Sequence, residues 1–185
     1  MAWITKDSAG TKVDRTAGPY FTETMKAELR ETYLPRYETA MAALMPALHM
    51  VQHEHGWIPH AAMLEIADEL DLKPADVFDT ATFYEEYWLK PAGKRVVSVC
   101  RSIACEFCGQ QAITDAIRDK LDIEVGETTQ DGKFSLVELE CIGSCGTAPA
   151  ALVGEHLHEN LTPERMIEIL DEVAKEIDQN PTARH

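Results

Sequence analysis

Four cysteines lie in two close pairs, each directly after a strand-like run. Cys100 and Cys105 follow the run 96–99, and Cys141 and Cys145 follow the run 134–140. Short apolar, β-branched runs of this kind are typical of strands. We therefore expect a folded sheet to bring the two loops together, where four converging thiolates indicate a metal or cluster site.

A change of hydrophobic period divides the chain at Pro91-Ala92-Gly93. Before this point we expect helices over 22–33, capped by Thr22, and over 38–55, where Pro46 either kinks the helix or marks its true first turn. Two more are expected over about 60–70 and from Pro74 through Trp88. The sequence thus predicts an N-terminal arm over 1–20 and a helical bundle domain over 21–92.

The second half has strand and helix periods in alternation. We expect strands over 94–99, 123–127, 134–140 and about 150–153, and a helix over 109–120. The final helix is capped by Thr162, has Pro163 at its first position and carries an apolar stripe that ends at Ile177. The predicted class is α/β, with a thioredoxin-like domain over 93–180 and a tail over 181–185.

The charge balance argues against some classes of function. The chain of 185 residues has 17 basic and 32 acidic side chains, and this net charge of −15 disfavours nucleic acid and anionic membranes as partners. No apolar stretch reaches the roughly 18 residues that cross a bilayer, and residues 1–15 lack the apolar core of a signal peptide. We expect a cytosolic, reducing environment, in which the five cysteines are metal ligands or redox groups rather than disulfides.

Three interpretations of these cysteines compete with an iron-sulfur cluster. Structural zinc usually takes C-x2-C knuckles, but one of the close pairs here has three intervening residues. A redox dithiol would use Cys105 and Cys108 at a helix start, and would leave the other three cysteines without a role. Buried core cysteines without chemistry would have no reason to pair in glycine-bearing loops.

A [2Fe-2S] cluster needs four thiolates, and the spacing allows two ligand sets. Cys100, Cys105, Cys108 and Cys141 match the plant-type ferredoxin spacing and leave Cys145 idle. The other set takes one pair from each loop and leaves Cys108 idle. We favour the second, because a helix over 106–120 would turn Cys108 away from the site.

The second cysteine loop, 141–149, is the most specific string in the sequence. Gly143 and Gly146 let the backbone pass close to an inorganic core, and the hydroxyls of Ser144 and Thr147 are expected to donate hydrogen bonds to sulfur. Such donors raise the potential of a cluster, whereas a nearby carboxylate such as Glu140 lowers it.

The residues from 99 to 105, together with the string CIGSCGTAP over 141–149, resemble the thioredoxin-like [2Fe-2S] subunit of respiratory complex I, the NADH:quinone oxidoreductase. The string GETTQDGKF over 126–134 resembles the hairpin that precedes the second cysteine loop of that family. In the helical half the resemblance includes Leu48, Gln52, the segment GWIP over 56–59 and TFY over 82–84. It extends over about 38–173.

This resemblance implies a thioredoxin-like ferredoxin domain with one [2Fe-2S] cluster on Cys100, Cys105, Cys141 and Cys145, and places Cys108 outside the ligand pattern. It implies an electron-transfer subunit beside a partner that binds NADH and FMN, with larger iron-sulfur subunits in the same complex. No residue here would act as acid, base or nucleophile. The complex would hold the chain at the cytoplasmic face of a bacterial membrane, without direct insertion. The same motifs occur in diaphorase subunits of NAD-dependent hydrogenases and formate dehydrogenases.

Other residues carry weaker signals. His49, His53 and His55 do not fit a catalytic zinc motif, because Met50 stands where a glutamate is needed. The aromatic residues 83, 84, 87 and 88 are expected to be mainly core, with Trp88 the one that faces a partner. The sequence has no G-x-G-x-x-G and no P-loop, so we expect NADH and flavin to bind a different subunit.

Overall fold

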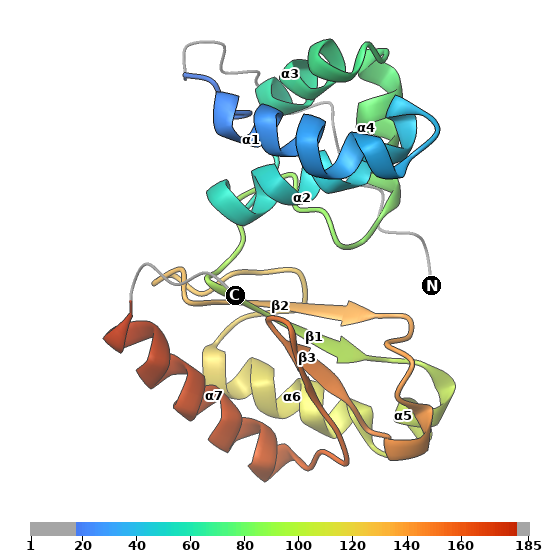
Figure 1. Ribbon diagram of the computed structural model, residues 1–185. Coiled ribbons are helices and arrows are strands. Elements are labelled where there is room, and N and C mark those ends of the chain that lie inside the picture. The colour runs from blue at the N-terminus through green and yellow to red at the C-terminus, as the bar shows by residue number, and fades with distance from the viewer. Residues whose placement is uncertain (1–17, 181–185) are drawn as a thin grey trace. The chain divides into compact units, whose positions relative to one another are not determined.

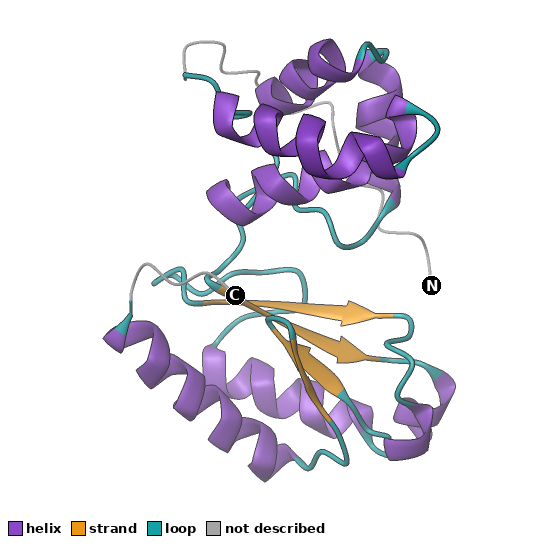
Figure 2. Cartoon of the chain, in the orientation of Figure 1, coloured by secondary structure: helices purple, strands orange, loops and turns teal. Residues whose placement is uncertain are grey.

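The structure, a computed structural model, describes residues 18–180. The chain divides into two compact units between Pro91 and Ala92. Figure 2 shows that the first is built from helices and that the second combines strands with helices. The predicted arm over 1–20 lies outside the described residues except for its last three, and the predicted tail over 181–185 lies wholly outside them.

In its described part, 18–91, the first unit has four α-helices, joined by tighter helical turns. They are α1 (Glu23–Glu28), α2 (Leu44–His55), α3 (His60–Leu70) and α4 (Pro74–Phe83), with a π-helical turn over Leu29–Tyr33 and 3-10 turns over Leu34–Arg36 and Ala40–Ala43. Thr22 caps α1 as predicted, since its hydroxyl accepts a hydrogen bond from the Met25 N–H at 3.3 Å. Pro46 is the third residue of α2, so it marks the first turn of that helix.

The fourth predicted helix is too long, because α4 ends at Phe83 and the chain then runs as a loop. The buried Gln52 explains this path. Its amide nitrogen donates to the Glu86 carbonyl at 2.8 Å and its amide oxygen accepts from the Trp88 N–H at 2.7 Å. Tyr87 is fully buried by this loop, whereas Phe83, at 67% exposure, is more open than the half-buried Trp88. The expectation that these aromatic residues are mainly core is therefore confirmed for Tyr87 and wrong for Phe83 and Tyr84, and the contact of Trp88 with a partner stays a prediction.

The second unit is a four-stranded sheet with helices. Its elements are β1 (Arg95–Cys100), α5 (Ile103–Phe107), α6 (Gln110–Leu121), β2 (Phe134–Leu139), a 3-10 turn (Cys145–Thr147), β3 (Ala151–Val153), β4 (His156–His158) and α7 (Pro163–Gln179). The strand order is β2-β1-β3-β4. Strands β1 and β2 are parallel, and the other two pairings are antiparallel. This arrangement confirms the predicted α/β class.

The expected sheet differs from the observed one in two places. Residues 123–127 form no strand, although an isolated bridge between Thr128 and Ser135 and a hydrogen bond from the Gly126 N–H to the Leu136 carbonyl at 2.7 Å join this region to β2. The short strand β4 was not predicted.

Helices α6 and α7 lie along one face of the sheet (Figure 1). Thr162 caps α7 by accepting a hydrogen bond from the Arg165 N–H at 3.2 Å. The core of this unit contains Val97, Val99, Ile113, Ile117, Leu136, Met166, Ile169, Leu170 and Ile177. Each of these aliphatic side chains contributes roughly 1.5–3 kcal/mol by leaving water, so the packed layer fixes the positions of the strand ends.

Candidate metal centre

The parallel pairing of β1 and β2 brings both cysteine loops to one edge of the sheet. Cys100, the last residue of β1, pairs in register with Leu139, the last residue of β2. Cys141 follows two residues later, and its loop is continuous with β3 on the other side of β1. The Cys100 N–H donates to the Ala150 carbonyl at 3.1 Å, so the end of β1 contacts both arms of the second loop. The convergence expected from the sequence is confirmed.

The first loop is compact because most of it is helical. Cys105 is the third residue of α5, and both Cys100 and Cys105 are buried. Cys108 follows the end of α5, with its N–H donating to the Ala104 carbonyl at 3.1 Å, and it is exposed. The predicted helix over 106–120 is therefore two helices that meet at Cys108 and Gly109.

Four thiols interact with one another at this edge. Burial raises the pKa of Cys105, and the thiols of Cys100 and Cys145 raise it further. A hydrogen bond of 3.4 Å from the Gly143 N–H lowers the pKa of Cys141. The thiols of Cys145 and Cys100 interact with that same sulfur and act in the same direction. The charge of Cys141 raises the pKa of Cys145, to which Cys100 also contributes.

Cys108 is exposed, and it is not among the main groups that shift the pKa of Cys105, Cys141 or Cys145. This arrangement also bears on the dithiol alternative. A reactive thiol has a low pKa and is partly open to solvent, whereas Cys105 is buried and its pKa is raised.

The second loop takes its shape from one glycine and one distant carboxylate. Gly143 has φ of 82°, in the left-handed region where a side chain would be strained. The hydroxyls of Ser144 and Thr147 lie 2.7 Å apart and both bond to the carboxylate of Glu159. The expectation that they donate to sulfur was therefore wrong, because a carboxylate is the stronger acceptor and lies within reach.

Backbone hydrogen bonds hold the same loop to the segment after β4. The Asn160 N–H donates to the Thr147 carbonyl at 2.8 Å, and the Leu161 N–H donates to the Pro149 carbonyl at 3.0 Å. Glu159 lies directly before these two donors. The segment 159–161 therefore supports the second cysteine loop along its whole later half, a role that no sequence motif indicated.

The donors suit a binuclear cluster. Each iron of a [2Fe-2S] cluster takes two protein thiolates, and the structure offers one close pair from each loop. The Gly143 N–H already points at the Cys141 sulfur, as a donor to a cluster ligand would. Within residues 18–180, no three His, Cys, Asp or Glu side chains surround one point in the way that a single ion needs.

The chain is similar to a known family over most of its length. Residues 30–174 match the thioredoxin-like [2Fe-2S] ferredoxin family. An NADH-quinone oxidoreductase subunit of Escherichia coli (strain K12) is 39% identical over 144 residues, which are 78% of this chain and 87% of that protein. Its counterpart in the NADH-quinone oxidoreductase of Rhizobium meliloti (strain 1021) is 36% identical over 148 residues, 80% of this chain and 88% of that protein.

A solved structure shares the fold. The NAD+-reducing [NiFe]-hydrogenase in its H2-reduced state superposes with a TM-score of 0.66 at 23% identity, over 79% of this chain. The match spans 25% of the hydrogenase chain, so this chain corresponds to about a quarter of that larger one. At this identity the likeness concerns the fold.

Proposed function

We propose that this chain, which belongs to the thioredoxin-like [2Fe-2S] ferredoxin family, is the electron-transfer subunit of an NADH-quinone oxidoreductase. We assign one [2Fe-2S] cluster to Cys100, Cys105, Cys141 and Cys145. The observation that carries this assignment is the parallel pairing of β1 and β2, which places the loop of Cys100 and Cys105 beside the loop of Cys141 and Cys145. When bound, the cluster accepts and releases one electron at a time.

The four thiolates have the role of ligands, and the rest of the chain positions them. Cys100 and Cys105 are fixed by regular structure, while Cys141 and Cys145 lie on an exposed loop. The exposed side is the one that a partner carrying the electron donor could approach. The electron donor is then the reduced flavin of a second subunit that oxidises NADH.

The expected partners follow from the same argument. A flavin- and NADH-binding subunit would deliver electrons, and larger iron-sulfur subunits would belong to the same complex. None of the helices in the described residues is long and apolar enough to cross a bilayer. We propose a peripheral subunit that is held at the membrane through its complex.

The helical first unit is a candidate for holding the partner. Phe83 and Tyr84 are exposed and pack against each other edge to face, with ring centroids 5.1 Å apart. Exposed aromatic pairs are common at the centres of protein interfaces. We propose that 18–91 serves mainly in assembly, and that 92–180 holds the cluster.

Anaerobic purification of the full chain tests the cluster. We expect a coloured protein with iron and acid-labile sulfide in equal amounts, about two of each per chain. Two exposed cysteines provide a matched pair of variants: Cys145→Ser should lose most of the bound iron, and Cys108→Ser should keep it. A dithiol enzyme would show the reverse dependence, with activity lost in Cys108→Ser. A colourless protein after reconstitution would refute the proposal.

Affinity purification of the tagged chain from its native cells tests the complex. We expect an NADH-oxidising flavoprotein and quinone-reducing subunits to copurify. Recovery of hydrogenase or formate dehydrogenase subunits in their place would assign the chain to a diaphorase of that kind.

A further inference from the structure

An arginine bridges the two cysteine loops. Arg101 directly follows Cys100, and its guanidinium reaches Glu140, which directly precedes Cys141. The Nε and Nη2 atoms of Arg101 donate to Oε1 of Glu140 at 3.1 and 2.8 Å. The Arg101 N–H donates to the Leu139 carbonyl at 2.9 Å. Backbone and side chain together therefore join the first residue after one ligand to the last residue before another.

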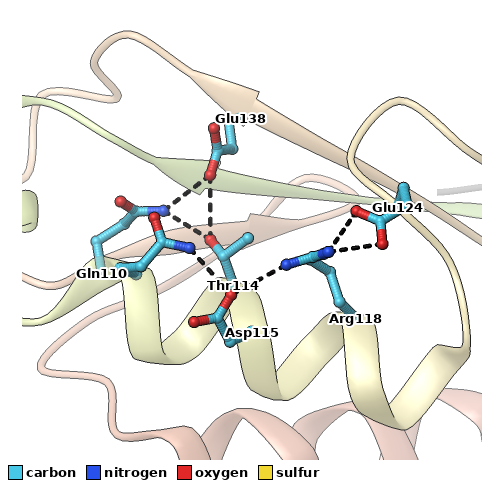
Figure 3. A network of polar contacts seen from close by, with 7 residues as sticks. Gln110, Thr114, Asp115, Arg118, Glu124 and Glu138 are labelled. Atoms are coloured by element: carbon cyan, nitrogen blue, oxygen red, sulfur yellow. Dashed lines mark hydrogen bonds and ion pairs between the residues drawn. The ribbon is translucent and has the colours of Figure 1, made fainter.

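A second carboxylate holds the same guanidinium from the inside of the unit. Oε2 of Glu138 lies 3.6 Å from Nη1 of Arg101. The other oxygen, Oε1, accepts hydrogen bonds from the Gln110 amide at 3.0 Å and from the Thr114 hydroxyl at 3.3 Å, as Figure 3 shows. Gln110 and Thr114 are both buried, and the Gln110 amide also donates to Thr114 at 2.6 Å. These hydrogen bonds hold Glu138 against α6.

The backbone of Arg101 and the carboxylates of Glu138 and Glu140 together fix the position of the guanidinium. The Arg101 side chain is 23% exposed and Glu138 is 18% exposed, so solvent screens this pair less than it screens Glu140, at 71%. Arg101 is one residue from Cys100, its partner Glu140 is one residue from Cys141, and neighbouring Cα atoms are about 3.8 Å apart. The guanidinium therefore lies on the order of 10 Å or less from the backbone of these two proposed ligands. Charges at such distances, partly shielded from water, interact appreciably.

We propose that Arg101 is a positioning residue whose charge, fixed between the two cysteine loops by Glu138 and Glu140, raises the reduction potential of the bound cluster. This inference rests on the proposed function, because it needs the cluster to be present. One electron added to four thiolates, two sulfides and two irons makes the site more negative by one unit, with no proton required. A fixed cation stabilises the added charge, and the two carboxylates oppose it.

Redox titration of the purified full chain, followed by the electron paramagnetic resonance signal of the reduced state, tests the inference. Arg101→Gln should lower the equilibrium constant for one-electron reduction about tenfold, which corresponds to about 59 mV. Arg101→Lys keeps the charge and should retain most of the potential. Glu140→Gln removes an opposing charge and should raise the constant about threefold, less than the arginine effect because Glu140 is more exposed.

Lys133 supplies the matched control. It is paired with Asp178 at 2.7 Å, its side chain is 25% exposed, and it lies directly before β2, at the end opposite the cysteine loops. Lys133→Gln removes the same charge about 20 Å away, given a rise of about 3.3 Å per residue along the strand. We expect the reduction potential of the Lys133→Gln variant to equal that of the wild type.

The potential is expected to fall in Arg101→Gln and to rise in Glu140→Gln. These opposite shifts separate an effect of charge from a loss of structure. The inference is wrong if Arg101→Gln shifts the potential no more than Lys133→Gln does. It is also wrong if Arg101→Lys lowers the potential as much as Arg101→Gln does. If Arg101→Gln fails to hold a cluster, Arg101→Met replaces it as the neutral variant: a potential below that of Arg101→Lys supports the inference and an equal one overturns it. A wild-type chain without a cluster would contradict the proposed function instead.

Discussion

The two cysteine loops hold their thiols in different ways. In the first, Cys100 ends a strand, Cys105 lies within a helix, and both are buried. In the second, Cys141 and Cys145 are exposed, and the segment between β2 and β3 contains one short 3-10 turn. One iron would thus be bound by buried thiols of the core, and the other by exposed thiols of a loop that the segment 159–161 supports.

The interactions that support the two loops also differ. The first loop is supported from the inside by Glu138 and by the buried side chains of Gln110 and Thr114. The second depends on Glu159 and on backbone hydrogen bonds from residues 160 and 161. We infer that the first loop is formed before a cluster binds and that the second is the more mobile half of the site.

Removal of one thiol from each loop should change the amount of bound iron most strongly. Cys100→Ser should reduce bound iron to less than about a tenth, because a buried, tightly packed ligand has no replacement. Cys141→Ser should keep a larger share, on the order of a third, since a serine oxygen or a water molecule can reach the exposed iron. Iron and sulfide analysis after anaerobic reconstitution measures both. Equal loss in the two variants would remove the distinction between the loops.

The next effect concerns the fastening of the second loop. Glu159→Ala leaves the hydroxyls of Ser144 and Thr147 without their shared carboxylate, so the loop should open more often. We expect iron release to a chelator to become several-fold faster, while the iron content at the start stays near that of the wild type. Glu155→Ala, in the turn between β3 and β4, is the control for loss of one acidic side chain. Equal release rates in the two variants would show that Glu159 does not fasten the loop.

The sequence predicted those parts of the molecule whose signals are local. Helix α3 was placed over 60–70, where the structure has it, and α7 begins at Pro163 behind its Thr162 cap as expected. Both helices have an apolar stripe and end signals within a few residues. The two cysteine loops were likewise predicted, because each follows a strand with a clear β-branched pattern.

The errors occurred where distant residues decide the structure. Ile123 and Val125 alternate like a strand, but Val125 is exposed and the segment lies at the end of α6 without a ladder. Strand β4 has one apolar residue, Leu157, and forms because β3 pairs with it. Since Glu159 follows that unpredicted strand, its contact with Ser144 was beyond reach from sequence alone. The Arg101 bridge also depends on the register of β1 against β2.

A smaller effect is expected inside the network under the first loop. Thr114→Val keeps the shape of the side chain but removes its hydrogen bonds with Gln110 and Glu138. Because Thr114 is 1% exposed, we expect a loss of about 1–2 kcal/mol in the free energy of unfolding. Ser144→Ala, in the half-buried second loop, should cost less, about 0.5 kcal/mol. Chemical denaturation of the two variants compares them, and an equal or larger loss in Ser144→Ala would contradict the ranking.

A weaker dependence on pH is expected for the segment that supports the second loop, through His158. Burial lowers the pKa of His158, and the charges of His156 and Arg165 lower it further, against the opposing Glu172. The folded protein therefore holds this proton less firmly than the unfolded chain, whose histidine titrates near 6.5. Stability is then fully present above about pH 6.5 and declines as the pH falls toward the lower folded pKa. Since His158 ends β4 directly before Glu159, acid should loosen the segment that supports the second loop.

We expect chelator-driven iron release to rise modestly between about pH 7.5 and 5.5 in the wild type, and the rise to be smaller in His158→Gln. The same pH profile in both proteins would mean that acid acts on the site by a route other than β4.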